Sequence, residues 1–238
     1  HALAAPVGAE ERLIICAVPG DPGLAPPLAW RPRAWRPGLR LPPLDKAWNG
    51  YVTVGAFGRA DDGTWRRRRE CYRGGVALMV DDVGTDVDPA VMLGVPPSAR
   101  IMTSPGNEQW WFMFEEPERD AAKFDALIRA FIAGPLGGRD PGMASVTRVG
   151  RLPGFRNCKA KYGPGGHVVE LRELAPGRRY SVDELAGAWA LKLEGRRERR
   201  ARVPDSSAEE RIAAWEAIFR WLEANDMMKR HEPDAGGW

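Results

Sequence analysis

The chain has 238 residues, of which 44% are hydrophobic and 28% charged, and its net charge is +3. This length suits one large domain, or one domain with a small appendage. No apolar run approaches the ~20 residues that a membrane span needs, so we expect no membrane association. The three cysteines are far apart and form no Cys-x-x-Cys pair, which argues against a structural zinc site and indicates a reducing, cytoplasmic environment.

Apolar periodicity predicts strands first and helices later along the chain. Short apolar or alternating runs indicate strands at 11–18, 51–57, 76–80, 100–103, 109–114 and 168–171. Helical spacing of apolar residues predicts a helix over 117–132, and two capping boxes predict helices over 181–193 and 207–223. Residues 19–48 hold eight prolines and three tryptophans and are predicted to be irregular. The chain is therefore expected to be a mixed α/β (α+β) protein.

The most informative run is Met79 to Thr85, where an apolar stretch leads into the adjacent carboxylates of Asp81 and Asp82. Hard divalent cations prefer oxygen ligands on a rigid support, and a strand end provides one. Two acids before Gly84 are also common in a solvated turn, so this alternative stays open from the pair alone.

Basic residues gather in three clusters. They lie at 65–69, at 148–161 and at 196–202. In the first two, aromatic side chains stand among the arginines, which suits a polyanion because guanidinium groups pair with phosphates and rings stack on bases. The third contains Glu198 and is interpreted as a solvated surface.

An ordered set of segments resembles the RepB-type and phage-type DNA-primase domains of the archaeo-eukaryotic primase (AEP, primase-polymerase) superfamily. The segments are NGYVTVGAF (49–57), VDDVGT (80–85), PSARIMTSPGNEQWWF (97–112), Asp140 and RVGRLPGFRNCKAKY (148–162). The resemblance extends over roughly 49–175, about half of the chain. Each motif is weak alone, but their common order makes the set fairly specific.

The resemblance implies an AEP primase fold: an RRM-like central antiparallel sheet flanked by helices, followed by a C-terminal helical appendage. We expect a catalytic domain over 1–178 and the appendage over 179–238, truncated from a longer chain. The implied activity is that of a DNA primase or primase-polymerase, which makes short primers de novo by two-metal nucleotidyl transfer. The implied cofactor is Mg²⁺ or Mn²⁺. The implied partners are single-stranded DNA, nucleoside triphosphates and a replicative helicase, fused or separate, in phage or plasmid replication.

The motif match also implies site residues. The catalytic and metal-binding residues are Asp81, Asp82 and Asp140. The nucleotide-binding residues are Ser104, Asn107, Gln109, Arg148, Arg151 and Lys159. Many superfamily members have a His in the second motif, whereas this chain has only Ser104, Asn107 and Gln109 there. Asp140 has no acidic neighbour, so a plain turn is an alternative for it.

Two other functions stay open. A non-catalytic single-stranded DNA-binding or origin-binding replication module would keep the basic patches without needing the acids. A metal-dependent nuclease would also use clustered carboxylates. Trp110 and Trp111 are expected to pack in the core rather than to stack on bases.

Overall fold

The computed structural model describes residues 7–26, 29–30, 32–36, 40, 42–92, 94–139 and 144–193. The chain divides into two compact units, His1–Gly195 and Arg196–Trp238, and all described residues lie in the first. The predicted helix over 207–223 is outside the described residues. The predicted boundary between 178 and 179 stays a prediction.

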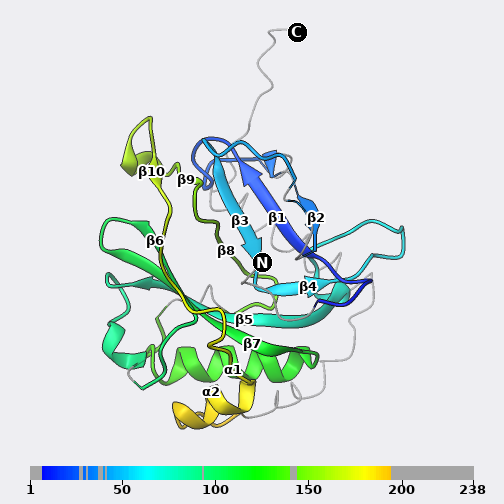
Figure 1. Cartoon of the computed structure of the whole chain (residues 1–238), viewed down its shortest axis with the longest axis vertical. Coiled ribbons are helices and arrows are strands. Elements are labelled where there is room, and N and C mark those ends of the chain that lie inside the picture. Colours follow the sequence, from blue (N-terminus) through cyan, green and yellow to red (C-terminus); the bar gives the residue numbers. More distant parts are fainter. Residues whose placement is uncertain are drawn as a thin grey trace, which may run out of the picture. The chain divides into compact units, whose positions relative to one another are not determined.

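The larger of two main sheets is antiparallel and has the strand order β11-β6-β7-β5-β4 (Figure 1). Its strands are β4 (Gly55–Phe57), β5 (Tyr72–Val83), β6 (Ala99–Ser104), β7 (Asn107–Glu118) and β11 (Glu170–Leu174). The strands β5 and β7 have 12 residues each and form its centre. The predicted hairpin of β6 and β7 is confirmed, with Pro105 and Gly106 at its turn.

A second antiparallel sheet has the order β2-β1-β3-β8. Its strands are β1 (Leu13–Val18), β2 (Arg33–Trp35), β3 (Asn49–Thr53) and β8 (Val149–Arg151). The buried strand predicted at 11–18 is confirmed, whereas the segment predicted to be irregular contains the short strand β2. A further two-stranded hairpin consists of β9 (Arg156–Asn157) and β10 (His167–Val168).

The single strand predicted over 51–57 is wrong, because the chain passes from one sheet to the other at Val54. The N–H of Val54 donates to the Arg148 carbonyl beside β8, and its carbonyl accepts from Val76 of β5. Val54 thus forms hydrogen bonds to both sheets, and in the chain it separates β3 from β4.

Among the described residues, the α-helices are α1 (Ala121–Ala133) and α2 (Val182–Ala188), and the short 3₁₀ helices are η2 (Arg69–Cys71), η3 (Pro89–Met92) and η5 (Ala160–Tyr162). The helix α1 begins after Asp120, whose side chain caps it, because Pro117 and Glu118 still belong to β7. The predicted capping box of Ser181 and Glu184 is confirmed, but α2 ends at Ala188 rather than near residue 193. Among the described residues, no helix has the length and apolarity to cross a membrane.

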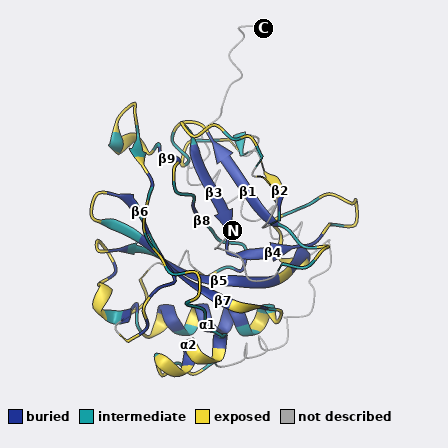
Figure 2. Cartoon of the chain, in the orientation of Figure 1, coloured by how far each residue is buried: buried dark blue, intermediate teal, exposed yellow. Residues whose placement is uncertain are grey.

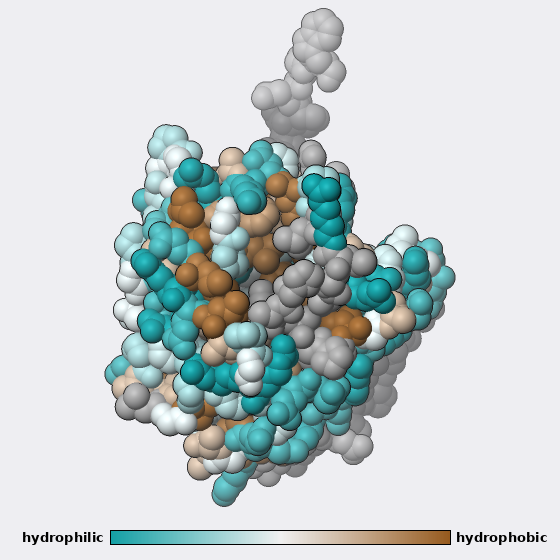
Figure 3. Space-filling view, viewed as in Figure 1, coloured by the Kyte–Doolittle hydropathy of each residue, from teal (hydrophilic) through white to brown (hydrophobic). Residues whose placement is uncertain are grey.

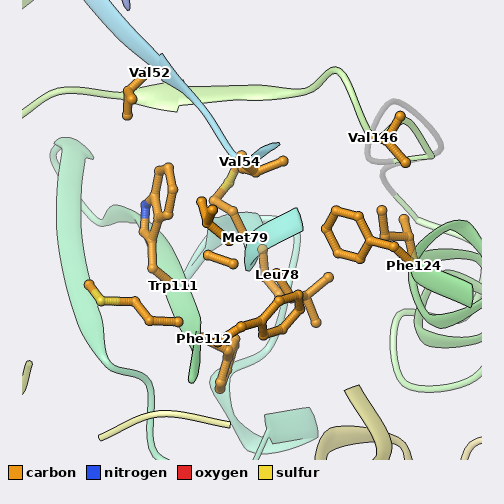
Figure 4. Packing of buried hydrophobic residues seen from close by; sticks show 14 of the residues in the cluster. Val52, Val54, Leu78, Met79, Trp111, Phe112, Phe124 and Val146 are labelled. Carbon is orange, nitrogen blue, oxygen red and sulfur yellow. The ribbon is translucent and has the colours of Figure 1, made fainter. Parts of the chain in front are cut away.

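Alternate residues of β7 face different layers. Phe112 and Phe114 point to the helices, where the Phe114 ring lies 5.6 Å from that of Phe124 of α1. Trp111 points the other way, toward Val52 of the second sheet (Figure 4). A Cβ at Gly150 of β8 would lie 2.1 Å from the Trp111 ring, so the sheets approach this closely only over glycine.

The larger sheet is therefore buried on both faces, by the helices on one side and by the second sheet on the other (Figures 1 and 2). Figure 3 shows a mostly hydrophilic surface with a short row of hydrophobic residues. The mixed α+β class with a central antiparallel sheet is confirmed.

Candidate active site

A β-bulge brings the two adjacent acids to one place. Val80 pairs with Trp110 and Val83 with Glu108, so β5 contains one more residue than β7 between these pairs. In a regular strand, neighbouring side chains point to opposite faces. Asp82 instead has a φ of +55°, and both Asp81 and Asp82 line the same pocket. The bulge therefore converts two consecutive residues into a pair of carboxylates.

The turn after the acids packs against the β6–β7 turn. Gly84 has a φ of +92°, and a Cβ there would lie 2.6 Å from the Gly106 carbonyl oxygen. This approach places Asn107 beside Asp82, and its Nδ2 donates to the Asp82 Oδ1 at 2.7 Å. The hairpin thus fixes one of the two carboxylates.

Asp81 lies close to Arg148, which precedes β8, and to Gln109 of β7. Burial and the neighbouring charge of Asp82 raise the pKa of Asp81, while Arg148 opposes this shift. The Arg148 Nη2 lies 3.4 Å from the Asp81 Oδ2. The Gln109 side chain also opposes this shift in the pKa of Asp81, while its Oε1 accepts from the Arg151 N–H at 2.8 Å. Gln109 thus connects the acids to β8.

The acids form one wall of a polar pocket of about 540 Å³. Basic and aromatic residues form a second wall, the basic wall, and residues of the β6–β7 turn complete the lining. Its lining residues are Asp81, Asp82, Thr85, Asp86, Thr103, Ser104, Pro105, Asn107, Arg151, Asn157, Lys159, Lys161 and Tyr162. A pocket that is lined by both carboxylates and cations suits a ligand that carries both a metal ion and phosphate groups.

Arg151 is the buried member of the basic wall, with 6% of its surface exposed. Its Nη1 donates to the Asn49 Oδ1 at 3.1 Å, and its guanidinium carbon lies 5.0 Å from the centre of the Tyr51 ring. Lys159 and Lys161 are exposed on the loop that contains η5. The wall therefore combines one fixed cation with two solvated ones.

Two amide oxygens in the pocket are buried and have no hydrogen-bond partner among the described residues: the Oδ1 atoms of Asn107 and Asn157. The orientation of Asn157 is fixed because its Nδ2 donates to the Thr103 carbonyl at 2.9 Å. A buried acceptor without a donor is costly, so these oxygens are suited to hydroxyl or amino groups of a ligand.

The structure brings together six of the nine predicted site residues in this pocket. They are Asp81, Asp82, Ser104, Asn107, Arg151 and Lys159. Gln109 and Arg148 lie behind the acids and contact Asp81 instead. Asp140 is outside the described residues.

The prediction missed Asp86, Asn157, Lys161 and Tyr162 as pocket residues. Lys161 and Tyr162 belong to the predicted basic-aromatic cluster, which was a usable signal. Asn157 gave none, because its unpaired oxygen is a property of the folded chain.

The donor set fits a hard cation in part. Two adjacent carboxylates supply oxygen ligands, and a bound cation would relieve the repulsion that raises the pKa of Asp81. Across the described ranges, no group of three or more His, Cys, Asp or Glu side chains is arranged to hold a metal ion. A third carboxylate would have to come from elsewhere in the chain or from the ligand.

The mixed α+β fold and a pocket that holds both carboxylates and cations suit a nucleotidyltransferase domain. Residues 60–190, more than half of the chain, match the family model of the RepB DNA-primase N-terminal domain. The chain therefore belongs to this family, and its function is that of a DNA primase, a DNA-directed nucleotidyltransferase. Primases of the archaeo-eukaryotic superfamily, which the sequence motifs of this chain resemble, generally depend on a divalent metal.

Three solved structures are similar to the chain. The crystal structure of primase RepB' has 19% identity and a TM-score of 0.50, over 95% of this chain and 66% of that one. The catalytic domain of primase RepB' in complex with initiator DNA has 22% identity and a TM-score of 0.49, over 76% and 86%. The AEP domain of the cyanophage S-2L primase-polymerase has 18% identity and a TM-score of 0.48, over 75% and 89%. No curated protein matches the chain.

Proposed function

We propose that this domain starts short primers de novo on single-stranded DNA, joining nucleoside triphosphates with the help of Mg²⁺ or Mn²⁺. The observation that carries the proposal is the bulge in β5, which places both Asp81 and Asp82 in a pocket that is also lined by Arg151, Lys159 and Lys161. A solvated turn would need neither feature.

In this proposal Asp81 and Asp82 hold the cation, with Asp140 as the third predicted ligand. Bound there, a divalent cation would lower the pKa of the attacking hydroxyl and stabilise the charge on the leaving phosphates. Asn107 fixes the Asp82 carboxylate through its 2.7 Å hydrogen bond. Gln109 and Arg148 orient Asp81 from behind, and Arg148 limits the repulsion between the acids.

The basic wall would bind the triphosphate. Arg151, Lys159 and Lys161 supply positive charge, and the Ser104 hydroxyl can donate to a phosphate oxygen. The buried Asn157 oxygen would instead accept from a hydroxyl group of the sugar or an amino group of the base. The 3′-oxygen of one nucleotide forms a bond to the α-phosphorus of the next, the bond to the β-phosphate oxygen breaks, and pyrophosphate leaves. The hydroxyl proton passes to solvent. Cations that already face the phosphates stabilise this transfer without reorganisation.

We further propose single-stranded DNA as the template and a replicative helicase, fused or separate, as the protein that exposes it. The template would lie on the basic side of the pocket, because neutralising phosphates by Lys and Arg provides most of the affinity for a nucleic-acid strand.

The test is primer synthesis on unprimed single-stranded DNA with labelled nucleotides and Mg²⁺ or Mn²⁺. The double variant Asp81→Asn/Asp82→Asn should fold but give no product. The matched control is Asp61→Asn, which removes one exposed carboxylate that lines no described pocket.

Short products from the native chain and the control, but not from the double variant, would support the proposal. Template binding without synthesis would indicate the DNA-binding replication module instead. Metal-dependent cleavage of the template, lost in the double variant, would indicate a nuclease.

A further inference from the structure

A row of side chains connects the acid pocket to the far side of the second sheet. Cys16 of β1 lies opposite Tyr51 of β3, and Tyr51 lies opposite Arg151 of β8. Residues opposite one another in antiparallel strands point to the same face. Arg151, which lines the acid pocket, and Trp30, whose ring centre lies 5.3 Å from that of Tyr51, both pack on Tyr51.

A second cavity, of about 300 Å³, lies at the other end of this row. Its lining combines apolar and aromatic residues with arginines. The residues are Ile14, Cys16, Trp30, Pro32, Trp65 and the arginines 66–68. An aromatic surface beside guanidinium groups is the combination that binds one nucleotide of a single strand, with its base stacked and its phosphate paired.

The three arginines differ in the charges around them. Arg66 pairs with Asp62, and Arg68 lies 3.8 Å from Glu70. Arg67 is exposed, donates to the Thr147 carbonyl at 3.0 Å and forms no ion pair with a described residue. No carboxylate of a described residue therefore neutralises its positive charge, and this guanidinium is the best placed of the three to take a phosphate.

The row also shows how far apart Cys16 and Arg151 are, which line the second cavity and the acid pocket. Neighbouring strands lie ~4.8 Å apart, so Cys16 and Arg151 are separated by about 10 Å across β3. Stacked nucleotides rise by ~3.4 Å each along a strand. About three nucleotides of a strand that occupies the acid pocket would therefore span the separation between these two lining residues.

We propose that the cavity of Trp30 and Arg67 is a second nucleotide subsite for the single-stranded DNA that enters the acid pocket. A base stacks on Trp30, and the adjoining phosphate pairs with Arg67. The inference rests on the proposed template binding but not on catalysis, and it assigns the first basic cluster a role separate from that of the second.

The experiment measures the affinity of the full chain for labelled oligothymidylates of 2 to 12 nucleotides, in EDTA and at several salt concentrations. The variants are Trp30→Leu, Trp30→Phe and Arg67→Ala. The matched control is Arg129→Ala on α1, which removes an exposed arginine that lines neither cavity.

We expect Trp30→Leu to weaken binding of the longer oligonucleotides about tenfold, and Trp30→Phe to restore most of it, because stacking needs only an aromatic face. Arg67→Ala should lower the slope of log affinity against log salt by ~0.7, as expected for one lost phosphate contact on a single strand. Dinucleotide binding, which does not reach this cavity, should not change.

Wild-type affinity and salt slope in the variants would overturn the proposal. If the variants lost affinity for thymidine triphosphate but kept their affinity for the oligonucleotides, the proposal would also be overturned, in favour of a site for free nucleotides. Arg67 is exposed, so its variant keeps the test valid even where Trp30→Leu disturbs the packing on Tyr51. Absence of DNA binding by the native chain would instead contradict the proposed template binding itself.

Discussion

The two walls of the pocket are built in opposite ways. The acids lie at the end of the 12-residue strand β5, in the centre of the larger sheet, and the adjacent hairpin fixes Asp82. Lys159 and Lys161 are exposed on a loop with a three-residue helix and a two-residue strand beside it. A metal tolerates little displacement of its ligands, whereas a phosphate can be followed by a long, solvated side chain. The fold thus fixes the groups whose geometry matters most.

The largest effect is expected on the acid wall. Asp82→Ala should reduce primer synthesis at least ~100-fold, because it removes a ligand on which the transferred charge depends, and leave single-stranded DNA binding unchanged. Synthesis and DNA affinity are measured on the same preparation, beside Asp61→Asn. Normal synthesis by Asp82→Ala would remove the acid pair from the proposed mechanism.

Next comes Asn107, which acts through Asp82 rather than on the substrate alone. Asn107→Ala removes the 2.7 Å hydrogen bond and should lower kcat ~10-fold, the effect of losing a partner that orients a metal ligand. It should also raise the Mn²⁺ concentration needed for half-maximal synthesis. A change in KM for nucleotide with an unchanged metal requirement would show that Asn107 binds the substrate only.

Smaller, additive effects are expected on the basic wall. Lys159→Ala and Lys161→Ala should each raise KM for nucleotide or template about threefold to tenfold, with kcat little changed, because an exposed cation contributes modestly and independently. The double variant should show the product of the two effects. A large loss of kcat in either single variant would show that catalysis depends on these lysines as strongly as on the acids.

The sequence predicted the acid wall better than it predicted how that wall forms. An apolar run before Asp81 was enough to predict a strand that ends in carboxylates, and Pro105-Gly106 between two β-rich segments was enough to predict the hairpin. The bulge that turns both acids inward depends on the register between β5 and β7, which is a long-range property. The same limit hid the break at Val54, where hydrogen bonds to two different sheets divide one apolar run.

The arginines show a second limit of prediction from sequence. Their clustering indicated a polyanion site, but burial decides what each can do. The Arg151 guanidinium lies over the Tyr51 ring at the pocket, while that of Arg148 forms an ion pair with Asp81. Neighbouring positions in one motif therefore have different environments, and no pattern of residue types distinguishes them.

The smallest expected effect is on stability, and it tests whether the acid wall is strained in the absence of metal. Burial and the charge of Asp82 raise the pKa of Asp81 in the folded chain above its ordinary, unfolded value. The folded state then binds this proton more tightly, so the contribution of Asp81 to stability is present at low pH and is lost as the pH rises through the raised pKa. Above its raised pKa, the ionised Asp81 weakens the fold.

Asp81→Asn should therefore raise Tm at pH 7 by about 2–4 °C, the shift that ~1 kcal/mol produces in a protein of this size, and the gain should disappear near pH 4. Mg²⁺ or Mn²⁺ should raise the Tm of the native chain but not that of the variant, because only the native pair gains from a bound cation. Thermal unfolding at several pH values, with and without metal, measures both. A lower Tm for Asp81→Asn at pH 7 would mean that the ion pair with Arg148 outweighs burial, and that the acid wall is already balanced without a metal.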